Sequence, residues 1–301
     1  RKLLERSVRG AVQTGLNIND LRDLPVFLPS TALQENVGNL VKNAKEIFDQ
    51  SKSLYAQAEE LLLTELRLKD FKAEEDLYSI VNFSDVKATG RMDAEYFQPK
   101  YERIVESIRK HNARKIGDMA TLVGHAAQSP YDETGNIAVL AQTHMKRNLA
   151  VDASAFSNFT KDELIKTNDK KFILKKGDVL ISSAGEPGLT SVWTSDYDGK
   201  VIPGSFVTIV RFGKEIDPLY AGVFLNTPAG KLQFERDYTG SIQQYVYPSK
   251  IKEIVVPVLP KEMQNKIAEL VRESHAARTR AKQLLEDAKR KVEELIESEI
   301  R

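Results

Sequence analysis

The segment Val37-Gly-Asn-Leu40-Val-Lys-Asn-Ala44-Lys-Glu-Ile47 decides the architecture, because two of its positions recur every seven residues. Small or apolar residues at this spacing fall on one face of an α-helix and form the seam of a coiled coil. The run has no proline up to residue 71 and no glycine after Gly38, which predicts one helix over residues 31–71 with Thr31 as its N-cap. The seam positions of this helix are Val37, Leu40, Ala44, Ile47, Leu54, Ala58 and Leu61.

A second long helix, predicted over residues 261–300, carries the same seam. Small residues let helix axes approach closely, so we expect the two helices to pack antiparallel as a coiled coil, or to pack on matching helices of another chain. At 1.5 Å per residue, about 40 residues make a rod roughly 60 Å long. The alternative, a pair of core helices in a compact bundle, is disfavoured by the length of both runs. The seam positions of the second helix are Ile267, Leu270, Ala277, Ala281, Leu284 and Ala288.

The chain also contains a long internal repeat, in which residues 10–68 reappear in outline as residues 240–298 at an offset of 230. For example, Gly10-Ala-Val-Gln13 corresponds to Gly240-Ser-Ile-Gln243. This spacing is far longer than the ~20–50 residues of a solenoid period. It indicates that the chain holds the tail of one large module and all of the next.

The sequence between the two helices shows the pattern of a domain that contains both strands and helices. Short apolar runs predict strands, and two further runs predict helices, so we expect an α+β fold with a mostly antiparallel or mixed sheet. An earlier apolar run, Leu21–Pro29, predicts a strand closed by proline. The predicted organisation is the tail of a preceding module over 1–30, a long helix over 31–76, one α/β domain over 77–260 and a second long helix over 261–301. The predicted strand and loop segments are 136–141, 172–183 (with a turn followed by a strand from Lys175), 191–194, 200–202, 206–212 and 253–259. The two predicted helices are 93–110 and 220–226 with 231–234.

Composition excludes several classes of protein. The 301 residues are enough for one or two domains, and the net charge of +1 means that nucleic-acid binding would need a local basic patch. The absence of cysteine excludes disulfides and thiol chemistry, and it fits a reducing cytoplasm. No apolar run reaches the ~18–20 residues of a membrane span, so we expect a cytoplasmic protein without a membrane partner.

Motifs for metal binding and catalysis are missing from the sequence. The four histidines have no metal-ligand spacing, and neither glycine-rich phosphate motif occurs. We therefore expect no metal, no cofactor and no catalytic residue in this chain.

A series of short motifs occurs in a fixed order. In that order, followed by a long helix and partly duplicated, they resemble the DNA-specificity subunit of type I restriction–modification enzymes, and the resemblance covers nearly the whole chain. The motifs are Arg91-Met-Asp-Ala-Glu-Tyr-Phe97, Lys176-Gly-Asp-Val-Leu-Ile-Ser-Ser-Ala-Gly185, Phe224-Leu-Asn-Thr-Pro-Ala-Gly230, Gly240-Ser-Ile-Gln-Gln244, Ile254-Val-Val-Pro-Val-Leu-Pro260 and Gln264.

The resemblance implies a non-catalytic subunit that reads double-stranded DNA. In that family two target-recognition domains each read half of a split site, and two antiparallel helices set the gap and dock the modification subunits. Adenine methylation and S-adenosylmethionine would belong to those methyltransferase partners, and a restriction subunit is a further possible partner. This chain has one complete recognition domain. It is either a fragment of a full subunit or a half-size subunit that pairs with a second copy, and the sequence leaves both open.

Candidate DNA contacts are amides, cations, histidines and small residues in four segments. The first segment, Gln142–Asn148, follows an apolar strand, so we expect a loop at a sheet edge that contacts base edges and phosphates. The small residues of the segment Ser182–Gly188 would let the backbone approach DNA. Each segment also has a plainer interpretation, as a polar loop, a turn or a strand connection. The candidates are Gln142, His144, Lys146, Arg147, Asn148, His125, Gln128, Ser183, Gly185 and Gln243.

Two other functions remain open at this level. The heptads alone would also fit a coiled-coil scaffold whose middle domain binds protein rather than DNA. An enzyme with unrecognised chemistry is the least favoured, because no catalytic motif occurs. The DNA target sequence, the stoichiometry and cleavage by the assembly cannot be deduced from the sequence.

Overall fold

The computed structural model describes residues 8–9, 15–24, 28–195, 197–240 and 243–299. By its contacts the chain divides into two compact units, one of residues 1–49 with 277–301 and one of residues 50–276. Because this division runs through both long helices, it does not test the domain boundaries predicted from the sequence.

The first unit holds a short hairpin, a short helix and parts of the two long helices. Strands β1 (Val8–Arg9) and β2 (Gly15–Leu16) pair antiparallel. Helix α2 (Ile18–Arg22) begins after Asn17, whose side chain accepts a hydrogen bond from the backbone of Asn19. The predicted strand Leu21–Pro29 is therefore wrong at its start, because this N-cap favours a helical turn there. The repeat segment 10–13 and residues 25–27 lie outside the described residues.

Both predicted long helices are present, with slightly different ends. Helix α3 (Thr31–Glu65) begins at Thr31 itself, and the carbonyl of Ser30 accepts from the next turn, so Thr31 is not the N-cap. The helix ends six residues before the predicted position, because Arg67 adopts a left-handed conformation with φ of 53°. Helix α10 (Lys261–Glu299) matches its predicted range closely.

The predicted seam residues lie on the buried faces of these two helices, and none of them is fully exposed. In the second unit, the hydroxyl of Ser274 on α10 donates to the backbone carbonyl of Ser51 on α3 over 2.7 Å, so the two helices are in contact at this point. In the first unit, the guanidinium of Arg278 lies 4.8 Å from the ring centre of Phe48. Packing along the whole length as a coiled coil remains a prediction. The fully buried seam residues are Ala44, Ala58, Ile267, Ala281, Leu284 and Ala288, whereas Val37, Leu40, Ile47, Leu54, Leu61, Leu270 and Ala277 are half-buried.

The second unit is a mixed α and β fold built on three sheets, which agrees with the predicted fold class. The largest sheet has the order β4-β10-β7-β8, with all neighbours antiparallel. A second sheet has the order β6-β5-β9, with β5 and β9 parallel, and β11 pairs antiparallel with β3. The strands are β3 (Ala113–Lys115), β4 (Ala120–Gly124), β5 (Ile137–Leu140), β6 (Phe159–Thr160), β7 (Val179–Ser182), β8 (Thr190–Val192), β9 (Lys200–Pro203), β10 (Val207–Phe212) and β11 (Val255–Pro257).

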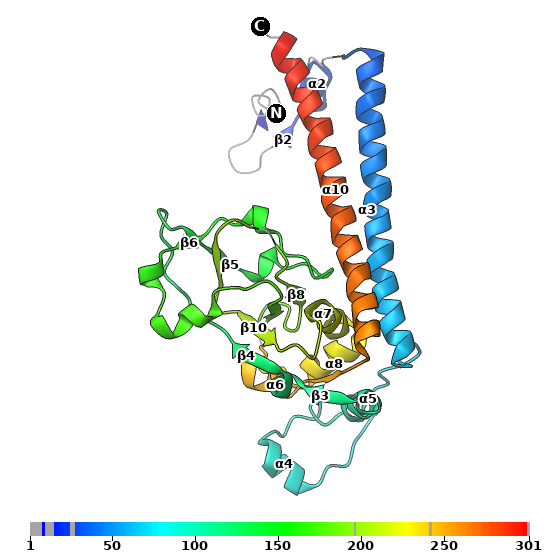
Figure 1. Cartoon of the computed structure of the whole chain (residues 1–301), viewed down its shortest axis with the longest axis vertical. Coiled ribbons are helices and arrows are strands. Elements are labelled where there is room, and N and C mark those ends of the chain that lie inside the picture. The colour runs from blue at the N-terminus through cyan, green and yellow to red at the C-terminus, as the bar shows by residue number, and fades with distance from the viewer. Residues whose placement is uncertain (1–7, 10–14, 25–27, 196, 241–242, 300–301) are drawn as a thin grey trace. The chain divides into compact units, whose positions relative to one another are not determined.

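Helices pack around these sheets: α7 lies beside β8, and α8 lies beside α7 (Figure 1). Both begin with proline at a first-turn position after a side-chain cap, Asp217 for α7 and Thr227 for α8. The predicted helix over 93–110 begins only at Pro99, because proline starts helices readily and disfavours helix at the residue before it. The helices are α4 (Phe83–Thr89), α5 (Pro99–Arg109), α6 (Ile116–Met119), α7 (Pro218–Asn226), α8 (Pro228–Arg236), α9 (Pro248–Ile251), and the 3-10 turns η1 (Gln142–His144), η2 (Ala153–Ala155), η3 (Asp162–Leu164) and η4 (Thr167–Phe172).

The largest sheet lies between two apolar cores. Along β7, Val179 and Ile181 belong to the core shared with α5, α7, α8 and the two long helices, whereas Leu180 belongs to the core shared with β5 and β9. Alternate side chains of a strand point to opposite faces, so a strand that is buried on both faces reads as a continuous apolar run. Within the described residues, no helix combines the length and apolarity that crossing a bilayer requires.

Candidate nucleic-acid interface

The segment Gln142–Asn148 follows β5, the middle strand of its sheet, as the sequence order predicted. Strand β5 ends at Leu140 between β6 and β9, and residues 142–144 form the 3-10 turn η1. The amide of Gln142 is half-buried, whereas Lys146 and Arg147 are exposed. This turn therefore presents an amide and two cations at the end of β5.

His144 supports this turn from inside. Its side chain is 6% exposed, Nδ1 accepts from the backbone N–H of Ala141 over 2.9 Å, and Nε2 lies 3.2 Å from the carbonyl of Ala155. Burial lowers the pKa of His144, which favours the neutral ring that this pairing requires. With both nitrogens engaged, His144 has no free group for a base in this conformation, and we reassign it from DNA contact to support of η1.

The segment Ser182–Gly188 places Gly185 directly beside Gln142. Gly185 is exposed and has a φ of 75°, and a Cβ there would lie 2.6 Å from Oε1 of Gln142. Only glycine combines that conformation with so close an approach. Ser183, by contrast, is fully buried, and its hydroxyl pairs with Thr208 over 2.9 Å. Ser183 therefore exposes no group to a ligand in this structure, and its contact with DNA stays a prediction.

An ion pair joins the same two segments. Arg147 lies 2.8 Å from Glu186, and both side chains are largely exposed. The backbone carbonyl of Arg147 accepts from the amide of Asn226, which also bonds both backbone groups of Thr190. Asn148 is half-buried, and its carbonyl lies 2.7 Å from Nε2 of His275 on α10. The cationic turn is thus tied to both α7 and α10.

A third predicted segment reaches the same edge. Gln128 is exposed, and its Oε1 accepts from the N–H of Ser205 at 3.5 Å, the long limit for a hydrogen bond. His125 is half-buried, and its Nδ1 has no hydrogen-bond partner among the described residues. The structure therefore groups Gln128 with the turn before β10, while His125 lies at the end of β4.

The fourth segment brings aromatic side chains that sequence reasoning missed. Tyr245 pairs with Ala184 as an isolated bridge, and the neighbouring Gln243 is exposed as predicted. The ring of Tyr245 packs edge-on against Phe206 and near Tyr247, with centroid distances of 5.8 and 5.5 Å. Phe206 and Tyr247 are each 50% exposed. Adjacent aromatic residues at a rim of amides and cations were a usable signal, because such side chains recur at binding surfaces.

The assembled edge can form hydrogen bonds and weak electrostatic contacts. The groups that it presents are amides, two cations, one carboxylate that pairs with Arg147, and aromatic rings. Among the described residues no cluster of three or more histidine or acidic side chains could hold a metal ion. This chemistry suits recognition of a polymer that offers donors, acceptors and phosphates.

Two motif residues that carry the family resemblance, Asp178 and Gln264, serve the scaffold of the second unit. Arg211 forms a two-pronged ion pair with Asp178, at 2.7 Å for each contact, and Asp178 is 1% exposed. Buried Gln264 accepts from the N–H of Asp217 and donates to the carbonyls of Glu215 and Leu259. These residues link loops that are far apart in sequence, and their polar groups form hydrogen bonds within the fold.

Comparisons with known proteins give weak likenesses only. No protein-family model and no curated protein matches the sequence. Among solved structures, the chain is similar to the S subunit of a type I restriction-modification system from M. genitalium, with 15% identity, a TM-score of 0.46, and 95% of this chain and 65% of that chain covered. The HsdS subunit from Thermoanaerobacter tengcongensis shows 15% identity, a TM-score of 0.36, and coverage of 96% and 63%.

A third solved structure belongs to an enzyme. The type IIG restriction endonuclease BpuSI shows 10% identity and a TM-score of 0.41, with 69% of this chain and 35% of that chain covered. The chain spans less than two thirds of the length of each of these three structures. With TM-scores below 0.5, the likenesses establish neither a family nor a function.

Proposed function

We propose that this chain is a non-catalytic DNA-recognition subunit of a type I restriction–modification system. The observation that carries the proposal is that the segments holding Gln142, Arg147, Gly185, Gln128 and Gln243 are linked by contacts in the second unit. Gln142 lies against Gly185, and Arg147 pairs with Glu186. Tyr245, two residues after Gln243, contacts Ala184 and Phe206, and Gln128 accepts from Ser205. The candidate contact residues come from four segments separated in sequence, and each segment was singled out for its DNA-contact chemistry. The ordered motifs between residues 91 and 264 support the same assignment.

The free groups at this edge suit duplex recognition. An amide such as Gln142 can bond the N6 and N7 edge of adenine with two hydrogen bonds, and an arginine can do so with guanine. Lys146 and Arg147 would contact phosphates or bases, and a phosphate would compete with Glu186 for Arg147. Affinity should fall with rising salt, because phosphate contacts release counterions.

Half-site reading and partner docking are the finer parts of the proposal. The recognition domain over 77–260 would read one half of a split target, and α3 and α10 would pack antiparallel to set the spacing and to dock adenine methyltransferase subunits. S-adenosylmethionine would bind those subunits, and a restriction subunit could join the assembly. Whether the chain acts as part of a two-domain subunit or pairs with a second copy stays open.

A selection experiment tests the proposal. The chain would be co-purified with the methyltransferase encoded beside it and used to enrich duplexes from a random library at moderate salt. We expect enrichment of one sequence pattern that contains at least one fixed half-site. Recovery of random sequence by a complex that does form would refute sequence recognition.

One observation favours the second candidate, a protein-binding scaffold. Exposed apolar side chains gather before α5, and several line a pocket of about 460 Å³. Contiguous exposed apolar side chains often mark a surface that binds another protein. Under the leading proposal, this apolar patch would bind a partner subunit. A protein-binding scaffold would also bind a partner there, but it would not select a DNA sequence. The exposed residues are Leu77, Tyr78, Ile80, Phe83 and Met92.

A further inference from the structure

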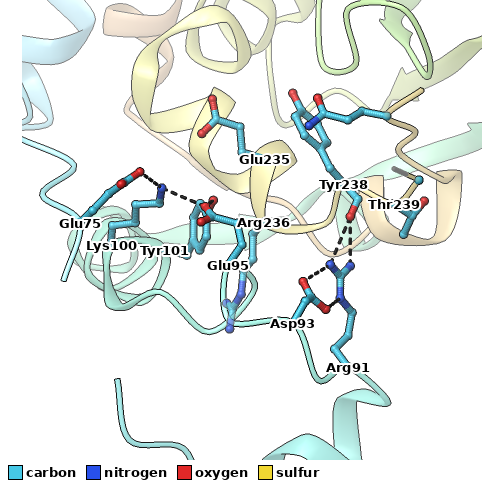
Figure 2. Close-up of a pocket in the computed structure, with 12 residues that line it drawn as sticks. Glu75, Arg91, Asp93, Glu95, Lys100, Tyr101, Glu235, Arg236, Tyr238 and Thr239 are labelled. Atoms are coloured by element: carbon cyan, nitrogen blue, oxygen red, sulfur yellow. Dashed lines mark hydrogen bonds and ion pairs between the residues drawn. The ribbon is translucent and has the colours of Figure 1, made fainter. Parts of the chain in front are cut away.

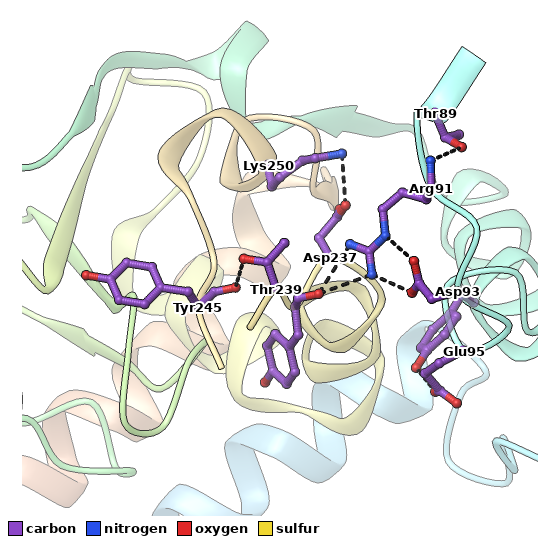
Figure 3. A network of polar contacts seen from close by, with 10 residues as sticks. Thr89, Arg91, Asp93, Glu95, Asp237, Thr239, Tyr245 and Lys250 are labelled. Carbon is purple, nitrogen blue, oxygen red and sulfur yellow. Dashed lines mark hydrogen bonds and ion pairs between the residues drawn. The ribbon is translucent and has the colours of Figure 1, made fainter. Parts of the chain in front are cut away.

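Arg91 lies at the centre of a polar network outside the candidate interface (Figure 3). Its Nε and one terminal nitrogen contact the two carboxylate oxygens of Asp93 at 2.7 and 2.5 Å. Both terminal nitrogens donate to the backbone carbonyl of Tyr238 at 3.2 Å. The guanidinium is 18% exposed and packs 4.7 Å from the ring centre of Tyr96. Every face of this side chain is therefore held in one geometry.

Tyr238 connects this network with the candidate interface in two directions. Its hydroxyl donates to the carbonyl of Pro187 over 2.8 Å, inside the segment that presents Gly185 and Glu186. Burial raises the pKa of Tyr238 to about 12, further above neutral pH than its ordinary value of 10. Arg91, Asp93 and Tyr238 also line an open pocket of about 840 Å³, where they face one another (Figure 2).

The second direction runs along the backbone. Thr239 and Tyr245 exchange two backbone hydrogen bonds of 3.0 and 2.8 Å, and Tyr245 pairs in turn with Ala184. Gly240 has a φ of 95°, and a side chain there would collide with the carbonyl of Gln243. The base of the segment that carries Gln243 is thus fixed next to the carbonyl that Arg91 holds. Asp237, one residue before Tyr238, is braced separately by Lys250 at 3.0 Å.

We propose that Arg91, oriented by Asp93, is a positioning residue for sequence readout, a role that rests on the proposed function. It fixes Tyr238, and through Tyr238 it aligns the Gly185 turn and the Gln243 segment against the same DNA. Arg91 touches no base itself. Its loss should therefore degrade discrimination between sequences more than it degrades binding in general.

The test compares three variants, Arg91→Ala, Arg91→Lys and Tyr238→Phe, with a control. The control is Arg103→Ala, which removes the exposed ion pair between Arg103 on α5 and Asp76. Each full-length chain, co-purified with its methyltransferase, is titrated with the selected duplex and with a scrambled duplex. Amide hydrogen exchange at Thr239 and Tyr245 is measured in the same samples. For Arg91→Ala we expect the affinity ratio to fall about tenfold, as for loss of a charged hydrogen bond, with faster exchange at those two amides.

Arg91→Lys should restore part of the ratio, because an ammonium keeps a donor for the Tyr238 carbonyl but not the fork on Asp93. Tyr238→Phe should lower the ratio without faster exchange at Thr239, and it carries the test if Arg91→Ala fails to fold. Equal loss of affinity for both duplexes, or an unchanged ratio, would overturn the inference while leaving the proposed function intact. Failure of the unmodified complex to discriminate would instead refute the proposed function.

Discussion

At the scale of single residues, the candidate interface separates side chains with free polar groups from side chains that the fold has already engaged. Gln142 and Arg147 reach solvent, whereas the polar groups of His144 and Ser183 form hydrogen bonds inside the second unit. Sequence alone cannot make this separation, because residue type gives the number of donors and acceptors but not their partners.

The first prediction concerns the half-buried Gln142 and the exposed Arg147. Gln142→Ala and Arg147→Ala should each weaken binding to the selected duplex by about 1–3 kcal/mol if each reads a base, since a lost bidentate contact costs about that much. Competition titration of the co-purified complex measures it. Gln57→Ala, an exposed amide on α3, is the matched control and should leave affinity unchanged. No loss at either interface position would remove this turn from the DNA contact.

A second prediction concerns the pH dependence of stability. Desolvation raises the pKa of Glu235 above its ordinary value of 4.5, so at neutral pH the folded state holds a carboxylate that is less favourable than in the unfolded chain. Glu235→Gln should therefore raise the free energy of unfolding at pH 7. The gain should shrink as pH falls through the raised pKa and vanish below about 4.5, where the carboxyl is protonated in both states.

Urea unfolding of both proteins between pH 4 and pH 8 measures this difference. Glu133→Gln, in an exposed loop, is the comparison variant and should not reproduce the trend. A gain that persists unchanged at pH 4 would show that the charge of Glu235 is not its cause.

At the scale of elements, buried polar pairs hold the loops between strands. Asp178 accepts from Arg211 on β10 and from the backbone N–H of Lys175, while its own carbonyl accepts from Trp193 after β8. The side chain of Asp178 thus joins the turn before β7 to β10, and its backbone carbonyl joins the same turn to the residue after β8.

Our third prediction follows from this pair. Asp178→Ala should lower the free energy of unfolding by about 3–5 kcal/mol, because it leaves the largely buried charge of Arg211 without its carboxylate partner. Thermal or denaturant unfolding measures the loss, with Asp169→Ala in η4 as a less buried comparison. A loss below 1 kcal/mol would contradict the role assigned to the pair.

The small residues of the heptad rows give a fourth prediction. Ala58 is fully buried on α3, whereas Ala56 is exposed on the same helix. Ala58→Leu should destabilise the protein by about 1–3 kcal/mol through overpacking, and Ala56→Leu should change stability little. Equal effects of the two substitutions on the melting temperature would show that small size is not required at the seam.

How far sequence predicts this fold differs from element to element. The apolar runs predicted β5, β9, β10 and α7 within two or three residues, because the pattern of burial sets them. Local chemistry that the pattern does not report changed the rest: Asn17 caps a helix in a predicted strand, and Arg67 ends α3 early. The contact between Gln142 and Gly185 depends on long-range packing, which no local pattern reveals.

At the scale of the whole molecule, the net charge of +1 gives no general affinity for nucleic acid. Binding would depend on a small edge with two exposed cations and on the partner subunits. We therefore expect the isolated chain to bind DNA weakly and the complex to bind it in a salt-dependent manner.

The most direct test of the central claim is to sequence modified adenines in cells that carry the methyltransferase with and without this chain. We predict one split target that is methylated only when the chain is present, and whose fixed half-site loses methylation with the Gln142→Ala and Arg147→Ala double variant. A methylation pattern that is the same without the chain, or no adenine methylation despite a stable complex, would contradict the account.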